Sequence, residues 1–219
     1  TLQDPESLQI RKKNVVNTMM TSIFIIGVGI VMWVLFGYSL SFAPSGNAFI
    51  GDFRWLGLEG VSLTEGYTDD ASIPNMVFSA FQMMFAVITP ALITGAVAGR
   101  MKFKSIFVFT IFWSLIVYYP LAHMVWGQGG LLGADGIGAL DFAGGDVVHI
   151  SSGVSALVLC ILLGKRHDYE HSIYRIHNIP TVVLGASLLM FGWFGFNAGS
   201  ALAADGLAAA AETPVVINA

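Results

Sequence analysis

Long apolar stretches separated by short polar connections dominate the pattern of this chain. Five of them reach the roughly 20 residues that an α-helix needs to cross about 30 Å of hydrocarbon. They run from Val15 to Ser41, Ile73 to Gly99, Ser105 to Trp126, Phe142 to Gly164 and Pro180 to Ala203. A shorter stretch, Val215 to Ala219, has the composition of the start of another span. The pattern predicts an all-α, polytopic helical membrane protein with five visible transmembrane helices.

Composition supports lipid as the solvent of this chain. Apolar residues make up 55% of the 219 positions and charged residues only 11%, whereas a soluble domain carries about 25% charged residues. The net charge of -4 offers no basic surface for a nucleic acid. The single cysteine, Cys160, excludes an intramolecular disulfide, and its place in an apolar stretch indicates a packing role.

Basic residues gather in alternate connections, which predicts the orientation of the helices. They are Arg11, Lys12, Lys13, Arg100, Lys102, Lys104, Lys165, Arg166 and Arg175, and only Arg54 lies in a connection of the other parity. Connections rich in Lys and Arg face the cytoplasm, so the connections that carry mostly acidic residues face outside. The sequence therefore predicts a polar segment, 1–14, on the cytoplasmic side. It is followed by a transmembrane domain, 15–219, of a multi-pass protein in the plasma or inner membrane.

The fourth apolar stretch contains an ionisable side chain, His149, about a third of the way along it. Intramembrane ionisable residues usually face a cavity, a partner or a transport path, because the bilayer core holds no water. A buried histidine with a structural hydrogen bond is the alternative that position alone leaves open. Asp146 precedes His149 by one helical turn, and a carboxylate in contact would favour the protonated imidazole. Two such side chains do not make a metal site, which needs three or four ligands, so no metal or other cofactor is predicted.

Three aromatic clusters in the outer halves of the predicted helices could line a path past this histidine. They are Phe81 to Phe85, His123 to Gly127 and Gly192 to Ser200. The face of a tryptophan attracts a cation by roughly 0.5 to 2 kcal/mol, and a serine hydroxyl accepts an N–H bond. A pair of phenylalanine rings forms a hydrophobic constriction that excludes hydrated ions. These parts suit the selection of a protonated nitrogen base. The alternatives are packing for the phenylalanines and for His123, and an interfacial aromatic belt for Trp126.

Several of these segments together resemble the ammonium transporter (Amt) family of the Amt/Rh superfamily. The matching motifs are Arg11 to Asn14, Phe81 to Arg100, Ala122 to Gly130, Asp141 to Gly145, Val147 to Ile150 and Gly192 to Ser200. The resemblance extends over nearly all residues from Ile10 to about Ala203, and it implies the N-terminal half of such a transporter. It also implies an eleven-helix, inverted-repeat bundle that assembles as a homotrimer, with one pore in each subunit and no enzymatic activity.

The resemblance implies a recruitment site and a gate. Trp126, Phe85 and Ser200 would form the outer ammonium recruitment site, with Phe81 beside them. Phe85 and Phe196 would be the stacked rings of the gate.

Four further residues receive roles from the same resemblance. His149 would be the first of two pore histidines. Asp141 would cap the start of its helix, where a carboxylate satisfies free N–H groups and favours the helix dipole. Asp146 and Trp193 would support the site, through proton chemistry and packing respectively.

The function that follows from the resemblance is ammonium transport. Ammonium, or methylammonium, would be captured outside, deprotonated and conducted through a hydrophobic, histidine-lined pore into the cytoplasm. An ammonium sensor built on an Amt domain, a Rh-type ammonia or gas channel and a non-transporting structural fragment are the alternatives. The partners implied are membrane lipid and a PII-type nitrogen regulatory protein, and no nucleic acid.

Overall fold

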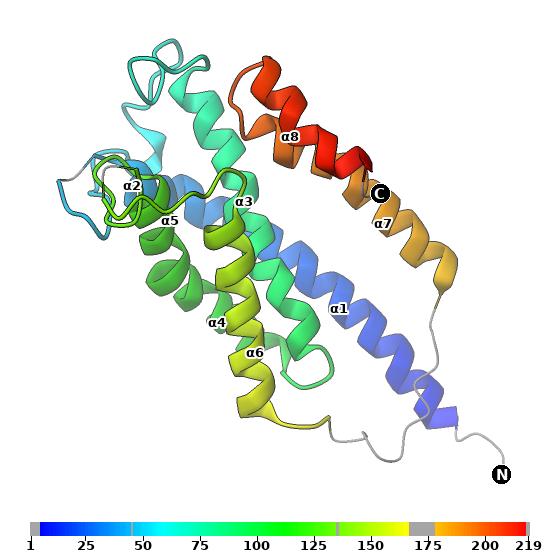
Figure 1. Cartoon of the computed structure of the whole chain (residues 1–219). Coiled ribbons are helices and arrows are strands. Elements are labelled where there is room, and N and C mark those ends of the chain that lie inside the picture. The colour runs from blue at the N-terminus through cyan, green and yellow to red at the C-terminus, as the bar shows by residue number, and fades with distance from the viewer. Residues whose placement is uncertain (1–4, 45, 135, 167–177, 218–219) are drawn as a thin grey trace. The chain divides into compact units, whose positions relative to one another are not determined.

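The structure, a computed structural model, describes residues 5–44, 46–134, 136–166 and 178–217 (Figure 1). All the named elements within these residues are helical. Five helical segments are long and apolar enough to cross a membrane. They are Val16–Phe42, Asn75–Val97, Phe103–Trp126, Gly145–Leu163 and Ile179–Gly199. The prediction of an all-α, polytopic chain is confirmed, and each of these segments coincides with one of the predicted spans.

Some of the spans combine α-helical and π-helical segments. The elements in chain order are α1 (Pro5–Met32), η1 (Trp33–Gly37), α2 (Tyr38–Phe42), η2 (Leu56–Leu58), α3 (Asn75–Val97), α4 (Phe103–Trp113), η3 (Ser114–Tyr118), α5 (Tyr119–Trp126), η4 (Gly145–Ile150), α6 (Ser151–Leu163), α7 (Ile179–Gly199) and α8 (Gly206–Ile217). The segments η1, η3 and η4 are π-helical, and each lies inside a membrane-spanning helix. Such π-helical turns are rare and occur frequently at functional sites.

The polar start of the chain is continuous with the first span. The sequence predicted a polar segment at 1–14 and a span from Val15, whereas α1 already begins at Pro5. Glu, Gln, Lys and Arg are good helix formers, so the change from polar to apolar residues does not interrupt the backbone helix. At the other end, α8 reaches Ile217 and so includes the start of the predicted apolar tail. Residues 1–4, Arg175 and residues 218–219 lie outside the described residues.

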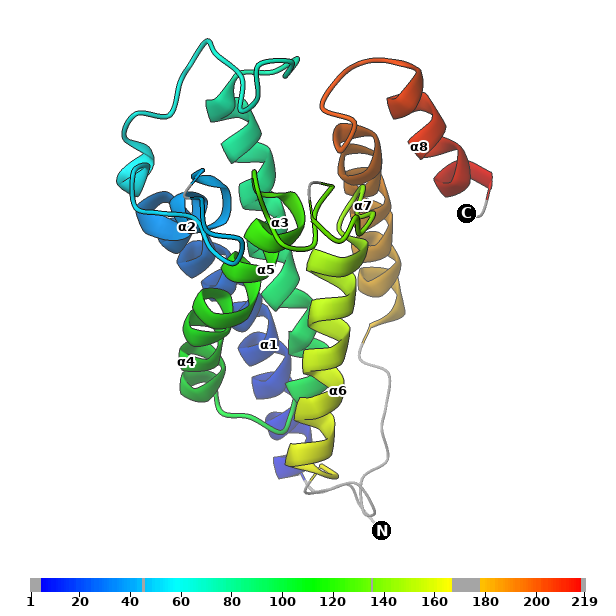
Figure 2. The ribbon, with the colours of Figure 1, turned by 60° about the vertical axis from the view of Figure 1, so that its left-hand side comes forward.

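The described chain divides into two compact units. The first holds residues 5–60 and 82–166, with α1, α2, most of α3, and α4 to α6. The second holds residues 61–81 and 178–217, with the start of α3 and the helices α7 and α8, and α8 packs against α7 (Figure 2). Asn178 begins α7, because its Oδ1 accepts the N–H of Thr181 at 3.1 Å and Pro180 occupies the first turn.

An aromatic core joins the end of the first span to α5 in the first unit. Trp33 is 1% exposed, and its ring lies 6.1 Å from the rings of both Phe42 and Tyr119. Tyr38 stacks on Trp55 at 5.3 Å with an angle of 16° between the rings. Aromatic pairs of this kind contribute about 0.5–1.5 kcal/mol beyond the area they bury. The core therefore holds α2 and α5 together, and Trp55 in the following loop packs on it.

Gly37→Ala is expected to destabilise the protein by about 1–3 kcal/mol through overpacking. A side-chain carbon at Gly37 would lie 2.7 Å from Cζ of Tyr119, whose ring is 1% exposed and has little room to move. Gly27→Ala in the same span is the matched control, because nothing lies within 4 Å of the added carbon. Thermal unfolding in detergent measures both variants, and an equal midpoint for the two would contradict the close contact.

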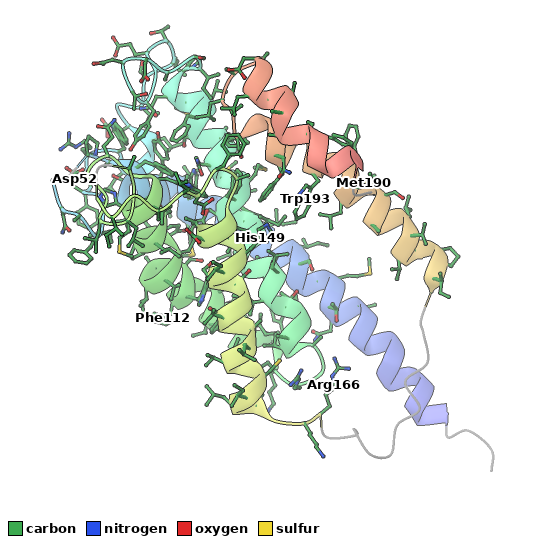
Figure 3. The ribbon with its side chains drawn as sticks, in the orientation of Figure 1. Asp52, Phe112, His149, Arg166, Met190 and Trp193 are labelled. Atoms are coloured by element: carbon green, nitrogen blue, oxygen red, sulfur yellow. The ribbon has the colours of Figure 1, made fainter. Side chains whose placement is uncertain are left out.

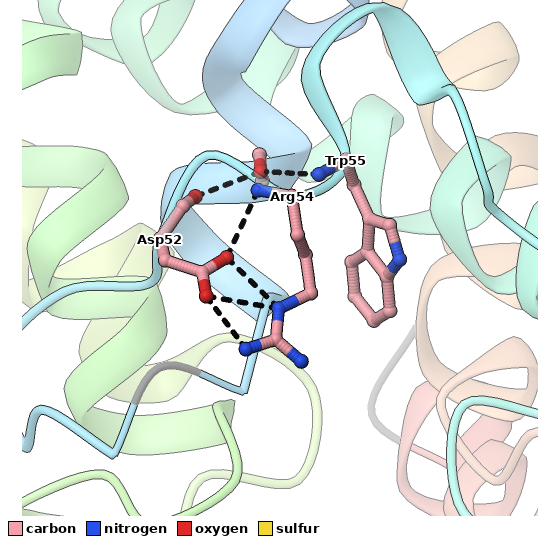
Figure 4. Close-up of polar contacts among 4 residues, drawn as sticks. Asp52, Arg54 and Trp55 are labelled. Atoms are coloured by element: carbon pink, nitrogen blue, oxygen red, sulfur yellow. Dashed lines mark hydrogen bonds and ion pairs between the residues drawn. The ribbon is translucent and has the colours of Figure 1, made fainter.

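Arg54, the one basic residue in a connection predicted to face outside, is paired with an acidic neighbour. Arg54 forms a bidentate pair with Asp52, with Nη2 2.7 Å and Nε 2.9 Å from Oδ2 (Figure 4). Ser39 Oγ holds the same loop, since it donates to the Asp52 carbonyl at 2.7 Å and accepts the N–H of Trp55 at 3.0 Å. The Arg54 side chain lowers the pKa of the Asp52 carboxyl. The pair is therefore present at neutral pH and is lost as the pH falls through that lowered pKa.

Candidate functional site

The fourth span begins at a carboxylate whose two oxygens accept four backbone N–H groups. Asp141 Oδ1 accepts from Gly144 and Gly145 at 2.6 and 2.9 Å, and Oδ2 accepts from Asp146 and Val147 at 2.8 and 2.9 Å. The first N–H groups of a helix have no intrahelical partner, and a negative charge there favours the helix dipole. Gly144 turns the chain into the helix with a φ of 96°, a conformation that favours glycine. Asp141 therefore sets where this span begins.

The main chain of the same residue holds a tryptophan. Trp126 Nε1 donates to the carbonyl oxygen of Asp141 at 2.9 Å. The Phe85 ring meets the indole edge to face, with 5.7 Å between centroids and 75° between the rings. Phe85 is 2% exposed, whereas Trp126 is only half-buried. A tryptophan fixed in this way can present part of its face to a cation. The structure thus brings Asp141, Trp126 and Phe85 together.

A buried histidine fixes the helix that carries this tryptophan. His123, one turn before Trp126, is fully buried, with Nδ1 3.1 Å from the Ser41 carbonyl and Nε2 2.8 Å from the Asn47 carbonyl. These carbonyls belong to the end of α2 and to the loop after it, so the ring ties α5 to both. A side-chain carbon at Gly127 would lie 2.6 Å from Nδ1 of this ring, which explains the glycine. The interpretation of His123 as a packed and hydrogen-bonded residue is confirmed.

His149 lies in the π-helical start of the fourth span, and Arg166 follows the other end of that span (Figure 3). The His149 side chain is exposed, whereas those of the preceding Val147 and Val148 are fully buried. Asp146 is half-buried and shares the π-helical segment, so the standard helical spacing assumed between it and His149 does not apply. The roles of His149 as a pore residue and of Asp146 beside it stay predictions.

The second unit brings the remaining candidate residues together at the end of α7. The rings of Trp193 and Phe196 stack at 5.0 Å with an angle of 23°. Ser200 Oγ donates to the Phe196 carbonyl at 2.8 Å, which leaves the lone pairs of the hydroxyl able to accept a bond. The Phe81 ring packs on the same helix, since a side-chain carbon at Gly199 would lie 3.0 Å from its Cε2. Ser200 is thus bonded to the main chain of Phe196, and Phe81 lies against Gly199, the residue before Ser200.

The predicted recruitment site and gate draw on both units. Trp126 and Phe85 belong to the first unit, and Ser200, Phe81 and Phe196 belong to the second. Trp126 and Phe85 are in ring contact, Ser200 is bonded to the Phe196 carbonyl, and Phe81 lies against Gly199. The joint site and the paired gate rings of Phe85 and Phe196 stay predictions.

Sequence reasoning overlooked two polar side chains near these residues. Gln82, between Phe81 and Phe85 in α3, is 7% exposed. Glu212 in α8 accepts the N–H of Ala198 at 2.9 Å. Polar and ionisable residues inside apolar helices are costly, so their positions alone were a usable signal. Among the described residues, no group of three or more His, Cys, Asp or Glu side chains could hold a metal ion.

Comparison with known proteins decides the family of this chain. The model of the Ammonium Transporter Family matches residues 3–219. The chain belongs to the ammonium transporter family. The resemblance inferred from the motifs is therefore confirmed.

Relatives and solved structures of the ammonium transporter family match most of this chain. The ammonium transporter of Bacillus subtilis is 52% identical over 199 residues, which cover 91% of this chain and 48% of that protein. The crystal structure of Mep2 from Candida albicans has a TM-score of 0.71 and 36% identity over 82% of this chain and 40% of its own. A sensor Amt protein has a TM-score of 0.66 and 31% identity over 94% of this chain and 50% of its own. The chain spans about half the length of the curated relatives it matches.

Proposed function

We propose that this chain forms the outer recruitment site and part of the pore of an ammonium transporter. Relatives named ammonium transporters are 42–52% identical to it over most of its length, which favours the Amt branch over a Rh-type gas channel. The observation that carries the proposal is the Phe85–Trp126 pair, whose indole is anchored to the main chain of Asp141. Because the indole N–H is already bound, the ring is held in place before a cation arrives. Binding of the cation therefore loses no conformational entropy of this side chain.

Transport begins with ammonium held by Trp126, Phe85 and Ser200, with Phe81 beside them. The aromatic faces replace part of the water around the cation, and the Ser200 hydroxyl accepts one N–H bond. The ion loses its water at the rings of Phe85 and Phe196, because a narrow hydrophobic constriction excludes a hydrated ion. Its proton passes to a water molecule at the outer mouth, so that neutral ammonia moves between the rings.

The neutral nitrogen then passes the imidazole of His149 into the cytoplasm. An imidazole on this path hydrogen-bonds the nitrogen or exchanges a proton with it. Asp146 lies in the same π-helical segment and supports the start of this span. Trp193 supports the site through its stacked contact with Phe196.

Trp126→Leu tests the recruitment site in the protein as its gene encodes it. Loss of the aromatic face is expected to raise the KM for methylammonium about three- to thirtyfold, the range that corresponds to the energy of a cation–π contact. Radiolabelled methylammonium uptake in cells without their own ammonium transporters measures this KM. Trp126→Phe retains an aromatic face and loses the bond to Asp141. Its KM should therefore lie between the KM of the wild type and that of Trp126→Leu.

Phe112→Leu is the matched control for these variants. Phe112 is an aromatic residue on α4 that is 57% exposed, and it belongs to none of the clusters (Figure 3). Its substitution should leave uptake as in the wild type. A normal KM for Trp126→Leu, with the protein present in the membrane, would rule out the recruitment role.

An ammonium sensor is the second candidate, because the sensor Amt protein matches 94% of this chain. A sensor would bind methylammonium at the same aromatic site without accumulating it. Binding to purified protein combined with absent uptake would favour the sensor, whereas saturable uptake favours the transporter.

The wider assembly follows from the family assignment. We infer a homotrimer in the plasma or inner membrane, in contact with lipid, with the Lys- and Arg-rich connections in the cytoplasm. A PII-type nitrogen regulatory protein is the regulatory partner inferred for the cytoplasmic side.

A further inference from the structure

Gln82 is a buried polar side chain that no proposed step yet uses. It is 7% exposed, and its carbonyl Oε1 has no hydrogen-bond partner in the part of the chain that the structure describes. Buried polar atoms without a protein partner are rare in folded proteins, and such an atom often binds an ion or a water molecule instead. The Gln82 carbonyl is an acceptor, so it binds either an N–H or O–H donor or a cation.

The position of Gln82 connects it to the aromatic pair of the first unit. Gln82, Phe85, Ala86 and Thr89 follow the spacing of one helix face, and all four are buried on α3. Side chains three residues apart on a helix are neighbours, so the amide lies next to the Phe85 ring. That ring is in turn in edge-to-face contact with Trp126.

Two donors associated with this face of α3 already have other acceptors. Trp126 Nε1, the only N–H of the indole, donates to Asp141 O at 2.9 Å. Thr89 Oγ donates to the Phe85 carbonyl at 2.6 Å. The Gln82 carbonyl thus has no partner among the described residues, and a bound molecule can supply one.

Ammonium fits this place better than an alkali ion does. It carries four N–H donors, so it can donate one bond to a carbonyl while other faces of the ion meet aromatic rings. A potassium ion needs several oxygens to replace its water, as in the carbonyl rings of selective channels. One carbonyl beside aromatic rings offers too few oxygens for that ion.

We propose that the Gln82 carbonyl is a further acceptor for the N–H groups of ammonium and helps to select it against alkali cations. The inference rests on the proposed transport function and adds a specificity-determining residue to its recruitment site. Gln82 binds the ion beside Phe85, and this bond replaces one that the ion made to water.

Three substitutions at this position test the acceptor in the protein as its gene encodes it. Gln82→Leu and Gln82→Met remove the carbonyl at similar volume, and Gln82→Glu keeps acceptor oxygens. The two apolar variants are expected to raise the KM for methylammonium, and the inhibition constant of ammonium, about tenfold, as for the loss of one bond to a charged group. The maximal rate should stay within about twofold, and rubidium should inhibit the apolar variants relatively more strongly than the wild type. Gln82→Glu should restore a KM near the wild-type value.

Leu92→Met is the matched control, because Leu92 lies on the same helix outside the aromatic cluster and is 41% exposed. Its KM should equal that of the wild type. A wild-type KM for Gln82→Leu or Gln82→Met, in protein that reaches the membrane, would show that the carbonyl holds only water and would overturn the inference. If both apolar variants and Gln82→Glu fail to reach the membrane, the role of Gln82 is structural and the inference is equally overturned. Failure of the proposed function itself is a separate result, namely a wild-type protein without saturable uptake.

Discussion

Asp141→Ala is expected to lower the free energy of unfolding by about 2–4 kcal/mol and to reduce methylammonium uptake at least about tenfold. The substitution leaves four backbone N–H groups at the start of the fourth span without their acceptor. It also loosens the carbonyl that holds Trp126, because that carbonyl belongs to the same residue. Denaturant titration in detergent measures the stability, and uptake at low substrate measures the site.

Asp205→Ala is the matched control for this result. Asp205 also begins a helix, since its Oδ1 accepts the N–H groups of Leu207 and Ala208, both at 3.0 Å. It is exposed and holds no aromatic residue, so its loss should cost about 0.5–1 kcal/mol and leave the KM unchanged. Equal effects of the two variants on uptake would mean that Asp141 acts only as a helix cap.

His123→Leu is expected to destabilise the protein by about 2–4 kcal/mol, the cost of a lost hydrogen bond, unpaired carbonyls and an imperfect fit in the core. The fully buried ring lies between the carbonyls of Ser41 and Asn47, and leucine has no donor for either. Because the ring ties α5 to the end of α2, the KM for methylammonium should rise as Trp126 loses its fixed position. Thermal unfolding and uptake are measured on the same preparation.

Met124→Leu serves as the control, because it changes a half-buried neighbour without removing a polar contact. Its stability should lie within about 1.5 kcal/mol of the wild type, as volume-conserving apolar changes usually do. A His123→Leu protein as stable as this control would contradict the tie between α5 and α2.

The spans and the aromatic motifs were within reach of the sequence, whereas several of the contacts were not. The five apolar stretches predict the spans because each one alone has the length that a bilayer requires. Gln82 was overlooked, since its burial depends on which face of α3 packs against other helices. The π-helical segments were missed as well, because apolar composition does not distinguish them from α-helix.

The sequence by itself determined that this protein is helical, crosses a membrane and belongs to the ammonium transporter family. Length, polarity and motif order are properties of local segments, so they can be read without coordinates. Only the tertiary structure decided that Asp141 receives four N–H groups, that its carbonyl anchors Trp126 and that His123 joins α5 to the end of α2. The physical reason is that hydrogen bonds are short and directional. The contacts of Trp126 and His123 join residues that are distant along the chain, and only the packing of the helices sets the distance between such residues.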